Sequence, residues 1–243
     1  MAVKYYNPYS DVGTQFTDGL NYIIANYPGT GAADFGNFNT IVVGYIQTLL
    51  DPTTIPPATL PPLFADLTLA VLPNSVNEYI NTQVGLNLST NTVQTALINS
   101  IYDGILSNSI ESLGDYFDSV DELITSADYI STVDKTPLYI ATVIAAASYN
   151  FWITVVAAPG GWATYLNANT AINYANIPKW VAISFTSALS GYSQILGASV
   201  SGVLTNDRGR FLASPMSIGA AMGVTAGKII FNWAQRPLVN CGG

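Results

Sequence analysis

The densest group of side chains that could do chemistry is a set of five carboxylates: Glu111, Asp115, Asp118, Asp121 and Glu122. Paired carboxylates can act as acid and base in catalysis, or they can bind a hard cation. A carboxylate-bridged metal site on facing helices requires Glu-x-x-His pairs, and the chain has no histidine. The run from Gly114 to Asp118 also lacks the alternating oxygen ligands and central glycine of an EF-hand loop. We therefore interpret these acids as a solvated helix face and predict no metal site.

Other catalytic groups are scarce in this sequence. Without histidine, the commonest general base is missing, and no lysine stands three residues after a serine as in a serine–lysine nucleophile. The phosphate-binding motifs G-x-x-x-x-G-K and G-x-G-x-x-G are absent. The single cysteine, Cys241, excludes an internal disulfide; we expect a free thiol, with an intermolecular disulfide as the alternative. We predict no catalytic or cofactor-binding residues, but keep a carboxylate-dependent enzyme, relying on Asp115 or Asp118, as an alternative.

Charge is both scarce and unevenly distributed. Only 9% of the residues are charged, against about 25% in an ordinary soluble domain, and a surface of uncharged polar residues can be buried against a partner at low desolvation cost. Residues 1–134 hold fourteen of the fifteen acids and one base, whereas residues 135–243 hold six bases and one acid. Either the two halves fold onto each other, or the basic end of one copy meets the acidic end of the next. Bases so widely spread do not form the basic face that nucleic-acid binding requires.

Apolar residues recur at helical spacing along most of the chain. We predict an all-α fold, a multi-helix bundle with a hydrophobic central helix hairpin in its C-terminal half. It is expected to form a single domain over residues 1–243, with the proline-rich connector 52–62 as a candidate internal boundary. The expected helices cover residues 11–27, 35–49, 63–71, 75–83, 90–106, 108–128, 136–158, 179–205 and 215–233.

The segment 108–128 has the clearest amphipathic pattern. Its apolar residues alternate by three and four positions, which places them in one stripe, with the carboxylates on the opposite side. The predicted stripe consists of Ile110, Leu113, Phe117, Val120 and Ile124.

A stripe of glycines marks the last predicted helix. Gly219, Gly223 and Gly227 recur every four residues, which on a helix leaves a flat groove for the backbone of another helix. Each glycine costs roughly 1 kcal/mol relative to alanine, so close packing is expected to offset them. The partner helix comes from the same chain or from a neighbouring copy. The predicted turn before this helix, NDRGR, carries Arg208 and Arg210, which are candidates to face another copy.

The uncharged stretch 136–158 is long enough, at about 1.5 Å per residue, to span a hydrocarbon layer of about 30 Å. Tryptophans in or near the ends of the uncharged segments suit an interfacial belt. These are Trp152, Trp162, Trp180 and Trp233. Against a span, polar residues at 148–150 interrupt its middle, and a helix that is apolar on all sides can equally lie at the centre of a bundle. We favour a buried core helix and leave a membrane span open.

The N-terminal segment KYYNPYSD is rich in tyrosine, with Tyr5, Tyr6 and Tyr9 close together. Tyrosine offers a large contact area with a polar tip, which suits protein interfaces. The segment is expected to lie across a neighbouring copy, or alternatively to cover its own core. It lacks the basic-then-apolar pattern of a signal peptide.

These features favour a non-enzymatic structural protein that self-assembles into a filament, layer or ordered array. Its expected partners are other copies of itself, and its expected location is extracellular or at the cell surface. Neither a cofactor nor a nucleic acid is predicted. The alternatives are a membrane-inserting helical protein, such as a pore former or bacteriocin-like toxin, and the carboxylate-dependent enzyme. The residues expected at helix-packing or assembly contacts are Gly219, Gly223, Gly227, Tyr5, Tyr6, Tyr9, Arg208 and Arg210.

Overall fold

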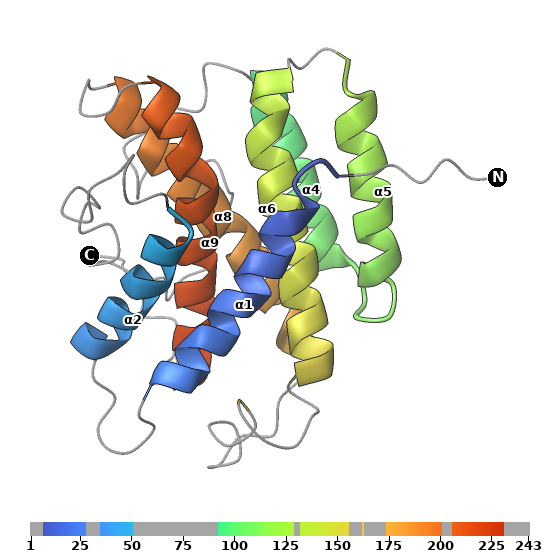
Figure 1. Ribbon diagram of the computed structural model, residues 1–243. Helices are drawn as coiled ribbons and strands as arrows, with labels where there is room; N and C mark the ends of the chain where they lie inside the picture. The colour runs from blue at the N-terminus through green and yellow to red at the C-terminus, as the bar shows by residue number, and fades with distance from the viewer. Residues whose placement is uncertain are drawn as a thin grey trace, which may run out of the picture.

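Every regular element in the described part of the chain is helical, which confirms the all-α fold class. The computed structural model describes residues 7–27, 35–50, 92–128, 132–155, 162, 174–200 and 206–230. The α-helices pack into a bundle (Figure 1). They are α1 (Ser10–Asn26), α2 (Phe35–Thr48), α4 (Thr92–Ser107), α5 (Leu113–Ser126), α6 (Thr132–Asn150), α8 (Ile177–Val200) and α9 (Asn206–Ile230). A π-helical segment, Phe151–Val155, follows α6, and a short 3-10 helix, Tyr174–Asn176, precedes α8.

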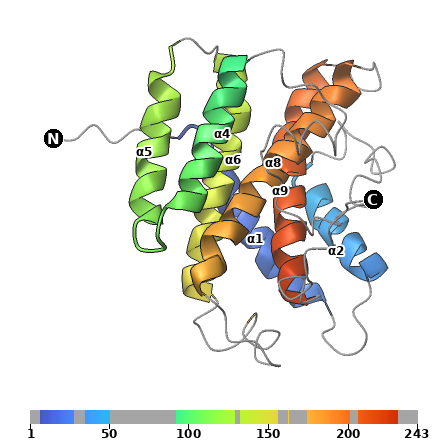
Figure 2. The same ribbon diagram turned by 180° about the vertical axis from the view of Figure 1, so that it is seen from behind.

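The bundle is arranged around α8, which packs against α9, α6 and α4. Figure 2 shows α8 running between α6 and α9. Every residue from Val181 to Ser193 is buried, so this part of the helix meets protein on all sides. The all-round burial explains the absence of charge in this segment, because an unpaired ion there would cost several kcal/mol. On the outside, α1 packs against α6 and α9, α2 against α1 and α9, and α5 against α6.

The long uncharged segment that begins near Thr136 is not one straight α-helix. α6 begins earlier, at Thr132, holds Pro137 inside it, and gives way at Phe151 to the π-helical segment. Among the described residues, no helix combines the length and the apolar character needed to cross a lipid bilayer.

The prediction of a turn at residues 206–210 is wrong, because α9 begins at Asn206 and includes Arg208 and Arg210. The prediction placed Pro215 at the first helical position, where its missing N–H would cost nothing. In the structure Pro215 lies inside α9 and is buried. Proline within a helix removes one backbone hydrogen bond, and the extensive burial of the following turns offsets that loss.

Several predictions fall outside the described residues. They are the helices at 63–71 and 75–83, the connector 52–62, Tyr5, Tyr6 and Cys241. The specific expectation of a central hydrophobic hairpin stays a prediction.

The interior where α6, α8 and α9 meet contains a hydrogen-bonded row of hydroxyl groups. The Ser184 hydroxyl on α8 lies 2.8 Å from the Ser148 hydroxyl on α6 and 3.0 Å from the Thr225 hydroxyl on α9. All three side chains are at most 1% exposed. A buried hydroxyl is costly unless it is paired, so this row specifies how the three helices align.

Candidate interaction surface

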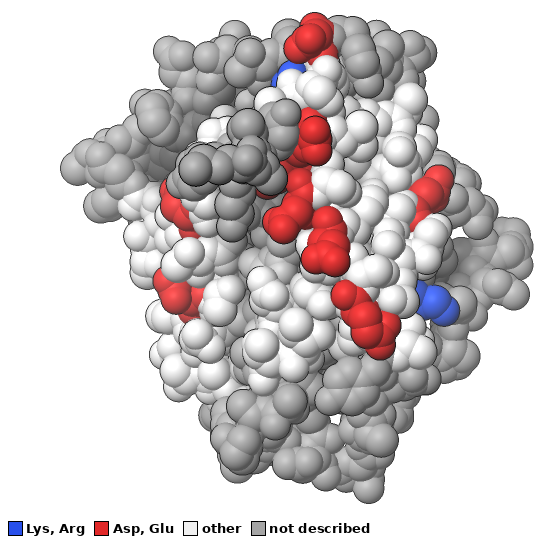
Figure 3. All heavy atoms as spheres, turned by 90° about the vertical axis from the view of Figure 1, so that its right-hand side faces the viewer, with Lys and Arg blue, Asp and Glu red and all other residues white. Residues whose placement is uncertain are grey.

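The acidic face of α5 is the most distinctive exposed surface of the described residues. One side of α5 packs into the core through Leu113, Phe117, Val120 and Ile124, as the spacing predicted. The other side exposes Asp115, Asp118 and Glu122, which we call the acidic face. Figure 3 looks onto the side of the molecule where α5 lies and shows carboxylates gathered across it. Within the described residues, no group of three or more carboxylate or thiol side chains is arranged to hold a metal ion.

Two other carboxylates of the predicted set differ from the acidic face in their surroundings. Glu111 precedes α5 and is fully exposed; hydrogen bonds from its own backbone N–H and from the Ser109 hydroxyl lower its pKa. Asp121 is half-buried, and burial raises its pKa, with a smaller contribution from the charge of Asp118. The prediction that all five acids are solvated is therefore wrong for Asp121.

One contact of Asp121 comes from the N-terminal segment. The side-chain amide of Asn7 donates hydrogen bonds to Asp121 Oδ1 at 3.0 Å and to the backbone carbonyl of Tyr139 at 3.2 Å. Asn7 is itself only 7% exposed. One residue far away in the sequence thus joins α5 to α6 and donates a hydrogen bond to the carboxylate.

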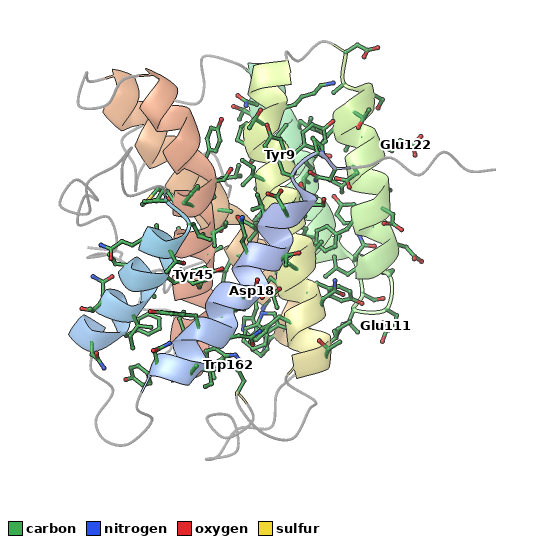
Figure 4. All side chains as sticks on the ribbon, in the orientation of Figure 1. Tyr9, Asp18, Tyr45, Glu111, Glu122 and Trp162 are labelled. Atoms are coloured by element: carbon green, nitrogen blue, oxygen red, sulfur yellow. The ribbon has the colours of Figure 1, made fainter. Side chains whose placement is uncertain are left out.

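Tyr9, one of the predicted interface residues, packs against its own chain. Its hydroxyl lies 3.3 Å from the Thr136 hydroxyl, and its ring centroid is 6.4 Å from that of Tyr139. Figure 4 shows Tyr9 at the start of α1, beside α6. The Tyr139 hydroxyl in turn lies 3.0 Å from the Thr125 hydroxyl on α5. This part of the N-terminal segment follows the alternative in which it covers its own core, and the outer face of Tyr9 stays half-exposed.

The three glycines of the predicted groove are inside the bundle. Gly219, Gly223 and Gly227 are all buried within the single chain, where α9 packs mainly against α8, α1 and α2. Their surface is therefore not available to a second copy.

Arg208 and Arg210 lie in the first turns of α9, at the opposite edge of the bundle from α5 (Figures 1 and 2). The structure therefore separates the positions of two predicted basic residues from the acidic face by the width of the bundle. Lys179, another base of the C-terminal half, is exposed at the start of α8.

Two exposed apolar side chains on the described surface were not predicted from the sequence. Leu106 and Leu123 are the exposed large apolar side chains among the described residues, at 37% and 38% exposure. The signal for Leu123 was present, because this leucine lies outside the apolar stripe of α5 and directly follows Glu122. Because successive residues of an α-helix point about 100° apart, its side chain lies between the buried stripe and the acidic face.

The three tryptophans in the described part of the chain, Trp152, Trp162 and Trp180, belong to one aromatic cluster with Phe151, and Trp233 lies outside the described residues. Trp152 and Trp162 are 2% and 1% exposed. The ring centroid of Trp152 is 4.4 Å from that of Trp180, and the Phe151 ring lies edge-on to both Trp152 and Trp162. Aromatic contacts of this kind stabilise a core by about 0.5–1.5 kcal/mol per pair beyond the area buried.

No protein family model, curated protein or solved structure matches this chain.

Proposed function

We propose that the protein is a non-enzymatic structural subunit that assembles head-to-tail with other copies of itself. The observation that carries this proposal is the position of α5, with its exposed acidic face, relative to the first turns of α9, whose sequence includes Arg208 and Arg210. The acidic face of α5 lies at one edge of the bundle, and the first turns of α9, with Arg208 and Arg210, lie at the opposite edge (Figure 1). Opposite charges on opposite edges of one molecule are complementary between molecules.

The geometry of such a contact favours an extended assembly. A contact between two different surfaces is heterologous, and it produces an open filament or layer unless its rotation closes a ring. The described acids concentrate in the N-terminal half and five of the six bases of the C-terminal half lie beyond α6. In such an assembly, each added copy would present the acidic face of α5 at one end and the start of α9, with Arg208 and Arg210, at the other.

The energetics require several contacts acting together. An exposed ion pair contributes about 0–1 kcal/mol and is screened over about 10 Å at 0.1 M salt. Charge complementarity therefore supplies orientation and rate of association more than affinity. The exposed side chain of Leu123 beside Glu122, and the scarcity of other charges to desolvate, would supply the apolar part of the contact.

Charge reversal tests the proposal. The double variants D118K/E122K and R208E/R210E each give both edges of the molecule the same sign, so each alone should fail to assemble. Mixed together, they should assemble with the two variants alternating, because every contact is again between opposite charges. Size-exclusion chromatography with light scattering, followed by electron microscopy, measures the outcome at low and high salt.

A matched control changes the same number of charges elsewhere. Asp11 and Asp18 are exposed on α1 instead of α5, and D11K/D18K should assemble as the wild type does. The proposal fails if the wild type is a clean monomer across concentration and salt, or if the mixture of the two reversed variants stays monomeric while the wild type assembles.

A further inference from the structure

Asn7 fastens the start of the described chain to α5. Its side-chain amide donates to Asp121 Oδ1 at 3.0 Å and to the Tyr139 carbonyl on α6 at 3.2 Å. Its side-chain oxygen accepts a hydrogen bond of 3.0 Å from the backbone N–H of Tyr9. The side chain is buried, and both its nitrogen and its oxygen are in use. The residues that precede Asn7 therefore start from a fixed point on α5.

Residues 1–6 precede the described part of the chain and carry one positive charge, Lys4. Asn7 stands directly before Pro8, and a residue before proline is held in an extended conformation. The chain therefore does not turn back towards α1 at Asn7. Lys4 lies three positions before Asn7, so their Cα atoms are at most about 11 Å apart. Lys4 is also the one base among residues 1–134.

The helix surface within that reach is negatively charged. Asp118 precedes Asp121 by three positions and Glu122 by four, so the three carboxylates are neighbours on the surface of α5. Asp118 and Glu122 are exposed and belong to the acidic face. In Figure 4, Glu122 lies on the outer side of α5, at a height along the bundle close to that of Tyr9.

The described bases do not serve this part of α5. The Lys135 ammonium donates to the Thr125 carbonyl at 2.9 Å, near the last turn of the helix. Lys179 is at the start of α8, which packs against α4, α6 and α9. Lys4 is therefore the base that the anchored chain delivers to Asp118 and Glu122.

We propose that residues 1–6 dock on the acidic face of α5 of their own chain, with the Lys4 ammonium paired to Asp118 and Glu122. Two independent observations support this docking. The hydrogen bonds of Asn7 bring the segment to α5, and the charge of Lys4 is opposite to that of the face. An exposed ion pair is weak by itself, but the anchor raises the effective concentration of Lys4 beside its partners.

The docked segment also regulates assembly, and this consequence rests on the proposed function. A neighbouring copy would use the same acidic face, so the segment competes with the head-to-tail contact. Removal of the charge of Lys4 frees the face for the neighbour. The docking itself does not depend on assembly.

Zero-length crosslinking with a water-soluble carbodiimide tests the docking, because it joins an amine to a carboxylate only where the two meet. Peptide mass spectrometry of the full chain should find Lys4 joined to Asp118 or Glu122. Asp11 is the internal reference, since it is exposed on α1 and seven positions from Lys4. Links to α5 should exceed links to Asp11 severalfold and should decline as salt screens the pair. Equal yields at α5 and Asp11 in low salt, or no link to α5, would overturn the docking.

An equal mixture of unlabelled and nitrogen-15-labelled protein separates docking within one chain from docking between copies. Every link within one chain joins two peptides of the same label. Links that join a labelled peptide to an unlabelled one would show that the segment docks on another copy, which rejects the proposal. K4R keeps the positive charge but lacks the amine, so it should lose the link.

The lowest protein concentration at which light scattering detects assembly tests the regulation. For K4Q it should fall, by up to about fivefold, the most that one exposed ion pair contributes. K4R should match the wild type, and K179Q, which removes the same charge from exposed Lys179, should not lower it. A K4Q value equal to or above that of the wild type rejects the competition. If the wild type never assembles, the proposed function fails, whereas the crosslinks still decide the docking.

Discussion

Gly191 of α8 lies directly against the backbone of Met216 on α9. A Cβ atom added at position 191 would stand 2.5 Å from the Met216 carbonyl oxygen and 3.1 Å from the Cα of Ser217. These are backbone atoms, so they cannot rotate away as a flexible side chain would. The two most closely packed helices of the bundle thus meet at a point where no side chain separates them.

We predict that G191A destabilises the protein, although alanine is the better helix former. The added methyl group must push the two helices apart, and overpacking of this kind costs about 1–3 kcal/mol. Denaturant unfolding followed by circular dichroism gives the free energy of unfolding of each variant.

Gly44 on α2 provides the matched control. A Cβ there would meet only the Tyr22 hydroxyl, at an ordinary 3.6 Å, so G44A should be neutral or stabilising by up to about 1 kcal/mol through helix propensity. If G191A is as stable as G44A, the close approach of α8 and α9 is not a constraint on the fold.

The contact between Gly191 and Met216 also shows which part of the helix packing could not be predicted from the sequence. The spacing of Gly219, Gly223 and Gly227 predicted a closely packed helix face, and all three residues are buried in the structure. The spacing did not single out Gly191 on the partner helix, which lies directly against the backbone of Met216. Small residues reveal that a helix packs closely, but the register between two helices depends on how all the others are placed.

In α5, too, the sequence of the helix itself predicts one feature, whereas another depends on a residue far away in the chain. The spacing of Leu113, Phe117 and Val120 predicted its buried side, because that depends only on the period of the helix. The spacing could not predict the hydrogen bond that Asp121 receives from Asn7, because the two residues are 114 positions apart in the sequence. The start of α9 was predicted wrongly because the preference of proline for the first position of a helix is overridden at Pro215, which lies inside α9.

We predict that replacing Ser184 on α8 with alanine destabilises the bundle. Its hydroxyl links the hydroxyls of Ser148 and Thr225 across three helices and also donates to its own Trp180 carbonyl at 3.2 Å. S184A leaves two buried hydroxyls without this partner, and each unsatisfied group costs about 1–3 kcal/mol. We expect a loss of about 2 kcal/mol or more in the free energy of unfolding, measured by urea denaturation.

Ser187, three residues further along α8, provides the matched control. Ser187 is fully buried, and within the described part of the chain its hydroxyl has no hydrogen-bond partner. S187A removes the same atom and should be neutral or stabilising, because no bond is lost and no partner is orphaned. Equal losses for S184A and S187A would mean that the hydroxyl row does not stabilise the bundle.

We predict that Tyr45 on α2 makes the stability of the protein depend on pH in the alkaline range. Its hydroxyl donates to the Gln15 carbonyl on α1 at 2.6 Å, and the side chain is 7% exposed. Burial, together with the negative charge of Asp18, raises the pKa of Tyr45 from 10.0 to about 12. Figure 4 shows both residues where α1 and α2 meet. Ionisation of Tyr45 would place a charge between two packed helices and abolish its donated hydrogen bond.

Because the folded pKa is raised, the stabilisation is complete below about pH 10 and is lost as pH rises towards about 12. Each such tyrosine adds up to about 1.4 kcal/mol per pH unit to the slope of unfolding free energy against pH. Y45F should therefore be about 1 kcal/mol less stable than the wild type at neutral pH, through the lost hydrogen bond, and should show a shallower alkaline slope. Tyr102, whose pKa burial also raises to about 12, should behave in the same way, so Y45F/Y102F flattens the slope further. Denaturant unfolding across this range measures the slopes, and an alkaline slope for Y45F as steep as that of the wild type would contradict the role assigned to the Tyr45 hydroxyl.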